Sequence, residues 1–211
     1  MNGSLEVRRL GRTQYEAAHA LQQELLVARV EGRIGDQLLL TEHDPVVTLG
    51  RKSPIGDASG ATVPVIQVER GGEATFHGPG QIVGYPIVLL SEERRDMHRW
   101  LRDLEGVVIQ TIGDFGVEGR RVDGLTGVWI GDRKVCSLGV AVRRWVTWHG
   151  FALNVHTDLA AFSTFQPCGL DPQVMTRLAD HVDGEVEMEA VEMRLLMRFA
   201  ERFGYREVIE R

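Results

Sequence analysis

The sequence has 211 residues, 43% of them hydrophobic and 26% charged, which are proportions typical of a globular protein. Its formal net charge of −6 argues against wholesale nucleic-acid binding, although it leaves room for a local basic patch. A chain of this length can bury a core without cross-links, so its two cysteines favour a reducing compartment over a disulfide. No apolar run is long enough to cross a membrane, and the first residues lack a signal-peptide core. We therefore predict a cytoplasmic protein that binds neither nucleic acid nor a membrane.

The first predicted element is a helix over residues 13–30. Thr13 and Glu16 have the spacing of a capping box, in which two side chains bond to free backbone N–H groups of the first turn. Apolar residues then recur at spacings of three and four, which places them on one face of a helix. These residues are Ala18, Leu21, Leu25 and Ala28.

Short strands dominate the middle of the chain. Seven segments are rich in branched and aromatic residues and are bounded by glycine, proline, aspartate or arginine pairs. Several are joined too closely for helical crossovers, so much of the sheet is predicted to be antiparallel or mixed. The segments cover residues 36–42, 46–50, 65–69, 82–90, 127–131, 134–142 and 145–155.

Two more helices are predicted, one between the strands and one near the C-terminus. Residues 97–112 carry a helical apolar pattern and are followed by Gly113 as a stop signal. Residues 189–203 carry another apolar face, and Gly204 is placed to cap it. The order of elements predicts an α+β fold, with a mixed, largely antiparallel central sheet flanked by helices, in one domain spanning 1–211.

A polar, glycine-rich stretch, "RGGEATFHGPGQIVGY", lies between two apolar segments at residues 70–85. A turn between strands needs only about two to five residues, so this length indicates a functional loop or an elaborate connection. Its backbone N–H groups are suited in principle to cradling phosphate. The stretch matches neither of the two common glycine patterns that bind nucleotides, so the sequence gives little support to a nucleotide site.

The two cysteines differ in their setting. Cys136 lies inside a predicted strand, where a small buried hydrophobic side chain is the ordinary outcome. Cys168 lies in the turn "FQPCGLDP", which can present a sulfur to a substrate and leaves the following N–H groups free to stabilise an oxyanion. A lone loop cysteine is more often incidental than catalytic, because only its neighbours make a thiol reactive.

Lys134 is the candidate neighbour for a reactive thiol. Its ammonium group, held beside a thiolate, would lower the pKa of that thiol by charge proximity. Lys134 lies at the start of a predicted strand, where an ordinary solvated lysine is the alternative. Since Lys134 and Cys136 project from the same face of that strand, spacing does not select between the two cysteines.

The histidines show no recognisable metal-binding pattern, and no paired cysteine motif occurs. His77 and His149 are each followed by glycine, and each taken alone is best interpreted as a structural histidine. The sequence therefore predicts no metal site.

Several motifs together resemble those of one family. They are Arg70-Gly71-Gly72, Thr75-Phe76-His77, Gly80-Gln81 and Tyr85, then "GDRKVCSLG", "HGFALNV" and "PCG", in the order that the family shows. The family is the lipoyl(octanoyl) transferases (octanoyl-[acyl-carrier-protein]:protein N-octanoyltransferases), which share their fold with biotin and lipoate protein ligases. The resemblance covers most of the chain, with a ligase-like core at about 30–205.

The resemblance implies an acyltransferase that needs no cofactor. Cys168 would carry an octanoyl group, taken from acyl carrier protein, as a thioester, and Lys134 would lower the pKa of this cysteine and transfer protons. The acceptors would be lysines of the lipoyl domains of 2-oxoacid dehydrogenase E2 subunits and of the glycine cleavage H protein, and we expect the enzyme to be a monomer. The implied substrate-binding residues are Arg70, Gly71, Gly72, Glu73, Ala74, Thr75, Phe76, His77, Ser137, Leu138, Gly139, Gly150, Phe151 and Ala152, with Gln81, His149 and Asn154 in support.

Two alternatives remain open from the sequence. One is an ATP-dependent lipoate or biotin ligase on the same fold, which needs no nucleophilic cysteine. The other is a non-catalytic module that binds a carrier protein.

A carrier protein would have to dock on a local basic patch of the surface. The partners implied by the resemblance are acidic proteins, whereas this chain is itself net acidic. Basic residues near the motifs form either a docking patch or a scatter of solvated surface charges. They are Arg51, Lys52, Arg120, Arg121, Arg133, Arg143 and Arg144.

Overall fold

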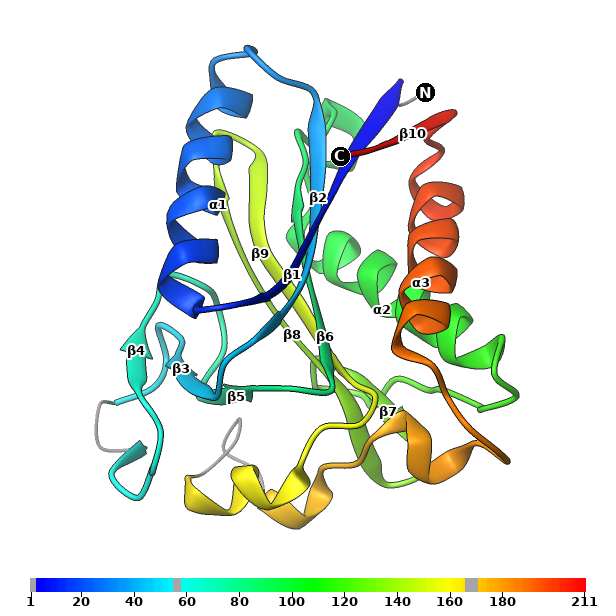
Figure 1. Ribbon diagram of the computed structural model, residues 1–211. Coiled ribbons are helices and arrows are strands. Elements are labelled where there is room, and N and C mark those ends of the chain that lie inside the picture. The colour runs from blue at the N-terminus through cyan, green and yellow to red at the C-terminus, as the bar shows by residue number, and fades with distance from the viewer. Residues whose placement is uncertain (1–2, 55–57, 166–170) are drawn as a thin grey trace.

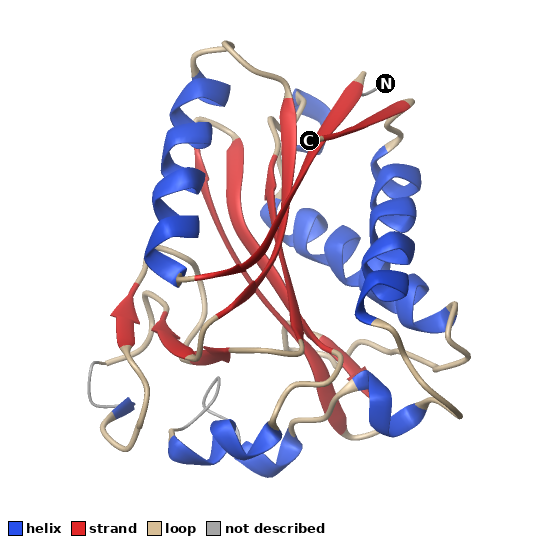
Figure 2. Ribbon diagram, viewed as in Figure 1, coloured by secondary structure: helices blue, strands red, loops and turns tan. Residues whose placement is uncertain are grey.

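A mixed seven-stranded sheet with helices on both faces organises the computed structural model, which describes residues 3–54, 58–165 and 171–211 (Figures 1 and 2). Strand β1 is parallel to both of its neighbours, and every other adjacent pair in this sheet is antiparallel. This arrangement confirms the predicted α+β fold with a mixed, largely antiparallel sheet. The spatial order is β10 (Glu207–Glu210), β1 (Ser4–Thr13), β2 (Asp36–His43), β6 (Gln81–Ile87), β9 (Val146–Asn154), β8 (Arg133–Arg143) and β7 (Val128–Ile130).

Three helices cover the sheet. Helix α1 (Tyr15–Val30) lies on one face, and α2 (Met97–Gly113) and α3 (Met188–Phe203) pack together on the other (Figure 1). Side chains alternate along β2, so Leu39 joins the apolar cluster under α1 while Leu38 and Leu40 join the cluster under α2 and α3. Burial on both faces explains why three leucines, Leu38 to Leu40, follow one another in this strand. Within the described residues, no helix is both long and apolar enough to span a membrane.

A smaller sheet lies beside one end of the large one. It consists of β4 (Val65–Gln67), β3 (Val46–Leu49) and β5 (Thr75–His77), with β3 in the middle. The chain between β4 and β5 contains the glycine-rich loop, so this sheet fixes both ends of that loop. Short 3₁₀ helices complete the described chain at η2 (Glu92–Arg94), η3 (Leu159–Thr164), η5 (Pro172–Val174) and η6 (Leu178–His181).

The helix ends in the structure can be compared with the caps predicted from the sequence. Gly204 caps α3 in the left-handed conformation, with φ 72°, as predicted. The capping box at the first helix is wrong, because Thr13 pairs with His43 in the sheet and α1 begins at Tyr15 after an N-cap that makes no side-chain bond. Gly113 is the last residue of α2 and not the residue that follows it.

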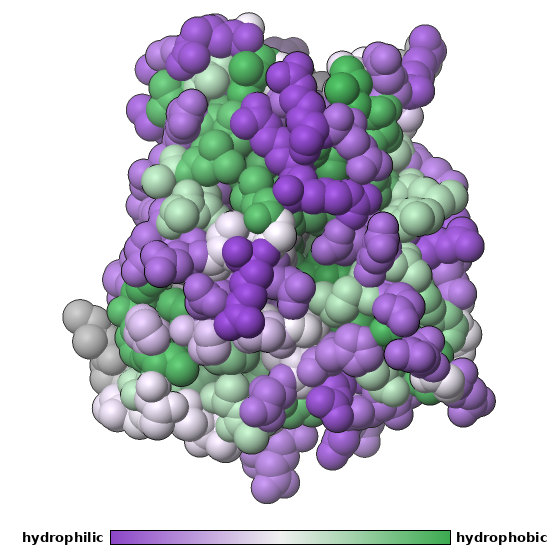
Figure 3. All heavy atoms as spheres, viewed as in Figure 1, coloured by the Kyte–Doolittle hydropathy of each residue, from purple (hydrophilic) through white to green (hydrophobic). Residues whose placement is uncertain are grey.

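The sequence analysis missed three strands, β1, β5 and β10. Strand β1 buries Leu5 and Val7 but exposes much of its remaining length, and hydrophilic side chains gather over this part of the molecule in Figure 3. All four residues of β10 are exposed, and β5 is only three residues long. Exposure weakens the apolar pattern by which strands are recognised in β1 and β10, and β5 is too short to show one.

Candidate active site

A cavity of about 150 Å³ lies between the middle of β8 and β9 and the glycine-rich loop. Most of the predicted substrate-binding residues line it, together with Lys134 and His149. Gly71, Ala74 and Phe76 are not part of this lining, and the last two pack in the apolar cluster of the small sheet. The predicted residues in the lining are Arg70, Gly72, Glu73, Thr75, His77, Lys134, Ser137, Leu138, Gly139, His149, Gly150, Phe151 and Ala152.

Close backbone contacts explain the glycines of this site. The Gly71 N–H donates to the Val140 carbonyl of β8 over 2.9 Å, which presses the loop against the sheet. A Cβ added at Gly139 would lie 2.8 Å from the Gly71 carbonyl oxygen, and one at Gly150 would lie 2.1 Å from the Gly84 carbonyl oxygen. These distances are shorter than van der Waals contact, so the chain needs glycine at both positions.

Arg70 fixes the shape of the glycine-rich loop as well as lining the cavity. Its guanidinium donates to the Thr48 carbonyl over 2.8 Å, to the Thr48 hydroxyl over 2.9 Å and to the Glu73 carbonyl over 2.7 Å. Buried backbone carbonyls need such donors, and a planar guanidinium supplies several from one side chain. Arg70 thus ties β3 to the loop that follows β4.

A chain of buried hydrogen bonds runs behind the cavity. His77 Nδ1 lies 2.8 Å from Gln81 Oε1, and Gln81 Nε2 donates to Asn154 Oδ1 over 2.8 Å. Asn154 Nδ2 in turn donates to the Thr176 carbonyl over 2.9 Å, and the Thr176 N–H donates to the Lys134 carbonyl over 2.9 Å. Gln81 and Asn154 therefore support the site from behind, and the chain connects the glycine-rich loop to the strand that carries Lys134.

Lys134 is a buried residue, so the alternative of an ordinary solvated lysine is wrong. It is 3% exposed and lines the cavity from the second position of β8. Its ammonium nitrogen lies 5.9 Å from the centre of the Trp129 ring, within reach of a cation–π contact. Burying a charged lysine costs free energy unless another group compensates the charge. A buried lysine that lines a cavity is therefore a candidate for a catalytic role.

The structure describes one of the two cysteines, Cys136. Cys136 is fully buried in the core under α2 and α3, and this burial raises the pKa of its thiol. The prediction of a small buried hydrophobic residue is confirmed for Cys136. Cys168 falls outside the described residues. The chain resumes at residue 171, and the backbone of Met175 forms a bridge with Lys134 within a few residues of that point.

Burial keeps the histidines around the cavity neutral. Desolvation lowers the pKa of His43 to about 4 and that of His149 to about 3, and it holds the pKa of His77 well below its ordinary value. A histidine with so low a pKa is a weak general base near neutral pH. Among the described residues of the lining, Lys134 is the better candidate for moving a proton.

Several residues of the lining escaped the sequence analysis. Tyr15 begins α1 and stacks on His77 with ring centres 5.9 Å apart, a position hidden by the misplaced start of that helix. Lys52 was considered only for docking, and Tyr85 only as part of a motif. The segment before β7 contributes the remaining three, Gly124, Leu125 and Thr126, and its glycine-flanked sequence was the available signal.

The fold belongs to a known class of protein. The family described as the lipoyl protein ligase A/B catalytic domain matches residues 14–200, and the chain belongs to this family. A bi-partite lipoate protein ligase from Thermoplasma acidophilum superimposes with a TM-score of 0.75 at 20% identity, covering 99% of this chain and 88% of that chain. This likeness confirms the fold that the motifs implied.

Within the family, the chain is similar to octanoyltransferases. It is 43% identical over 206 residues to the octanoyltransferase of Solibacter usitatus, covering 94% of this chain and 93% of the relative. It is 45% identical over 211 residues to the octanoyltransferase of Rubrobacter xylanophilus, covering 95% of each. The family resemblance inferred from the motifs is thereby confirmed.

Proposed function

We propose that this chain transfers an octanoyl group from octanoyl-acyl carrier protein to a lysine of a lipoyl domain, through a thioester on Cys168. Octanoyl transfer in protein lipoylation is supported by the full-length similarity to octanoyltransferases. The observation that carries the mechanism is the buried Lys134, whose backbone bonds to Thr176, eight positions beyond Cys168 in the sequence. A protein that merely binds a carrier has no need of a lysine buried in this way.

The proposed reaction has two halves. In the first, the Cys168 thiolate attacks the carbonyl carbon of the donor thioester, and the carrier leaves as a thiolate that takes up the proton Cys168 gave up. In the second, the acceptor amine attacks the acyl-enzyme, the bond to Cys168 breaks, and the amine loses its proton. Charged Lys134 favours the thiolate in the first half, and neutral Lys134 accepts the proton in the second. Because a thioester is already activated, neither half needs ATP.

Apolar side chains of the central strands provide a wall for the acyl chain. Leu138 and Phe151 face each other in the β8–β9 pairing and both line the cavity. Each methylene that is removed from water contributes about 0.8 kcal/mol. The enzyme is therefore expected to prefer a medium-length chain while rejecting a chain one carbon longer or shorter only weakly.

Intact-mass measurement after mixing with octanoyl-acyl carrier protein tests this function. A gain of one octanoyl group on the enzyme, followed by its loss to an added lipoyl domain without ATP, is the expected result. E2 lipoyl domains and the glycine cleavage H protein are the acceptors to compare. Transfer from free octanoate only in the presence of ATP would indicate the ligase, and carrier binding without any adduct would indicate the non-catalytic module.

Gly127 offers a way to move Lys134 without replacing it. Gly127 has φ 142°, and a Cβ added there would lie 2.5 Å from Lys134 Cε and 2.8 Å from the Cys136 carbonyl oxygen. We expect Gly127→Ala to displace the ammonium group and slow octanoyl transfer by roughly 10²-fold, the effect of misplacing a reacting group by about 1 Å. Gly131→Ala is the control, because it also alters a glycine of positive φ but its added Cβ meets nothing within 4 Å. Equal single-turnover rates for the two variants would contradict the placement of Lys134.

The basic residues divide into structural and exposed groups. Arg121 donates to the fully buried Glu105 over 3.0 Å, which makes it part of the fold and not of a docking patch. Arg51 is exposed beside the cavity residue Lys52, and Arg133 is exposed beside Lys134. Arg143 is also exposed, but it lies at the opposite end of β8 from Lys134. The exposed residues near the cavity are therefore the candidates for docking.

Charge reversal at these positions tests docking of the acidic carrier. We expect Arg51→Glu and Arg133→Glu each to raise the KM for octanoyl-acyl carrier protein about fivefold, since an exposed ion pair is worth up to ~1 kcal/mol. Added salt should raise the same KM in the parent enzyme, because it screens exposed charges. Arg143→Glu and a short soluble octanoyl thioester serve as controls. A similar change with the soluble thioester would show that these arginines have no role in docking.

A further inference from the structure

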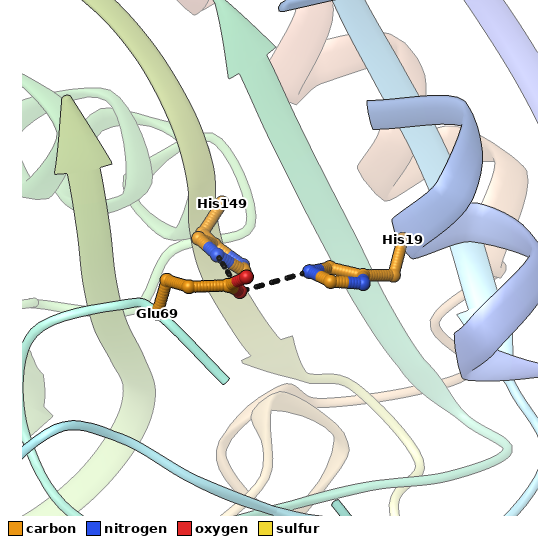
Figure 4. Close-up of side chains that lie close together, drawn as sticks. All are labelled: His19, Glu69 and His149. Atoms are coloured by element: carbon orange, nitrogen blue, oxygen red, sulfur yellow. Dashed lines mark hydrogen bonds and ion pairs between the residues drawn. The ribbon is translucent and has the colours of Figure 1, made fainter. Parts of the chain in front are cut away.

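Three potential metal ligands from distant parts of the chain meet beside the acyl cavity. Figure 4 shows His19 from α1, Glu69 from the loop after β4 and His149 from β9 pointing toward one another. Glu69 Oε2 lies 3.0 Å from His19 Nε2 and 3.8 Å from His149 Nε2. The three ligand atoms lie within 4.8 Å of one another.

His149 supplies an independent sign that this cluster is built for a ligand. It is 1% exposed, and neither of its ring nitrogens has a hydrogen-bond partner among the described residues. Its position is nevertheless well defined, because its backbone N–H donates to Gln22 Oε1 over 3.0 Å and the Trp148 ring stacks on it at 4.2 Å. Buried polar atoms normally have partners, so a fixed imidazole whose Nε2 lies 3.8 Å from the Glu69 carboxylate and has no hydrogen-bond partner calls for a ligand there.

The chemical types of the three ligand atoms indicate which metal ion would bind. Two imidazole nitrogens and one carboxylate oxygen form a set that binds Zn²⁺ with one position left open, whereas Mg²⁺ and Ca²⁺ prefer oxygen throughout. Tetrahedral Zn²⁺ with bonds of about 2.0–2.1 Å holds its ligand atoms about 3.4 Å apart. The two distances from Glu69 lie on either side of this value, and the Glu69 side chain is 44% exposed, so its carboxylate has room to adjust toward both imidazoles.

We propose that His19, Glu69 and His149 form a Zn²⁺ site at the edge of the acyl cavity. Glu69 directly precedes Arg70, and His149 directly precedes the glycine that faces β6, so an ion here ties the glycine-rich loop to both α1 and β9. The sequence analysis found no metal pattern because the three ligands are separated by many residues and come from three different elements.

Titration of the purified, metal-free protein with Zn²⁺, in competition with a chromogenic chelator, tests the proposal. One equivalent should bind to the parent protein and to the control His98→Gln, which alters an exposed histidine on α2. His19→Gln, Glu69→Gln and His149→Asn should each weaken binding by at least about 10- to 100-fold, the loss seen when even outer-shell partners are removed. Asparagine is chosen at position 149 because it tolerates the φ of 54° found there.

Cys168 is the competing site, since a reactive thiolate also binds zinc. Cys168→Ser should therefore still bind one equivalent of Zn²⁺. Co²⁺ bound to the parent protein should show no thiolate charge-transfer band. Loss of binding in Cys168→Ser, or unchanged binding in Glu69→Gln, would overturn the proposal. Glu69 is the decisive position if the histidine variants fail to fold, because its partly exposed side chain tolerates replacement by glutamine. Zn²⁺ should also raise the thermal unfolding midpoint of the parent protein but not that of Glu69→Gln.

Discussion

Replacing Cys168 with alanine should abolish the mass increase of one octanoyl group on incubation with octanoyl-acyl carrier protein. The proposed intermediate is a bond between the acyl carbon and this sulfur, and alanine has no atom that can form it. Turnover should fall by ~10⁴-fold or more, as it does when other acyl-transfer enzymes lose their covalent nucleophile. Intact-mass measurement and a single-turnover transfer assay on the same preparation provide the two readouts.

Cys136→Ala is the matched control, because it removes the other thiol of the chain. Cys136 is fully buried and its thiol pKa is raised, so this variant should still form the acyl-enzyme, although it loses some core packing. An adduct that persists in Cys168→Ala and disappears in Cys136→Ala would reverse the assignment. An adduct in both single variants would show that neither cysteine alone is required, and its persistence in the double variant would exclude a cysteine thioester.

The elements that the sequence predicts well are those whose burial is periodic. Helix α3 places Val191, Leu195 and Phe199 in the core at helical spacing and ends at a glycine, so both its face and its end can be read from the chain. Strand β1 fails this test because it exposes much of its length, and its place in the sheet depends on pairing with β2 and β10. Pairing between distant segments leaves no local pattern where both faces of a strand are largely exposed to solvent, as over most of β1.

The same distinction applies to the candidate site. The excess of glycine at residues 70–85 predicted a functional loop or an elaborate connection, and residues of this stretch line the cavity, although β5 and the start of β6 also fall within it. The burial of Lys134 was not predictable, because it depends on Gly127, on Trp129 and on the strand-like segment around Met175. These contacts come from two other parts of the chain, the segment 127–129 and the segment around Met175, and neither is apparent from the residues next to Lys134 in the sequence.

Lys134→Arg should separate the two roles proposed for this lysine. Arginine keeps a positive charge but effectively never gives up its proton. The variant should therefore still favour the Cys168 thiolate and form acyl-enzyme, to the extent that the bulkier guanidinium fits beside Gly127 and Trp129. It should lose the second half-reaction by ~10²- to 10⁴-fold, the usual contribution of a general base, because nothing accepts the proton of the incoming amine.

Lys134→Ala should lose both halves, and Gly127→Ala should resemble it more weakly, since that variant moves the same ammonium group without removing it. The rate of Cys168 alkylation as a function of pH measures the first role, and it should stay close to the parent profile in Lys134→Arg and shift to higher pH in Lys134→Ala. Single-turnover transfer from preformed acyl-enzyme to a lipoyl domain measures the second role. If Lys134→Arg transfers the octanoyl group at the parent rate, Lys134 acts through its charge alone, and the proton from the acceptor amine leaves by another route.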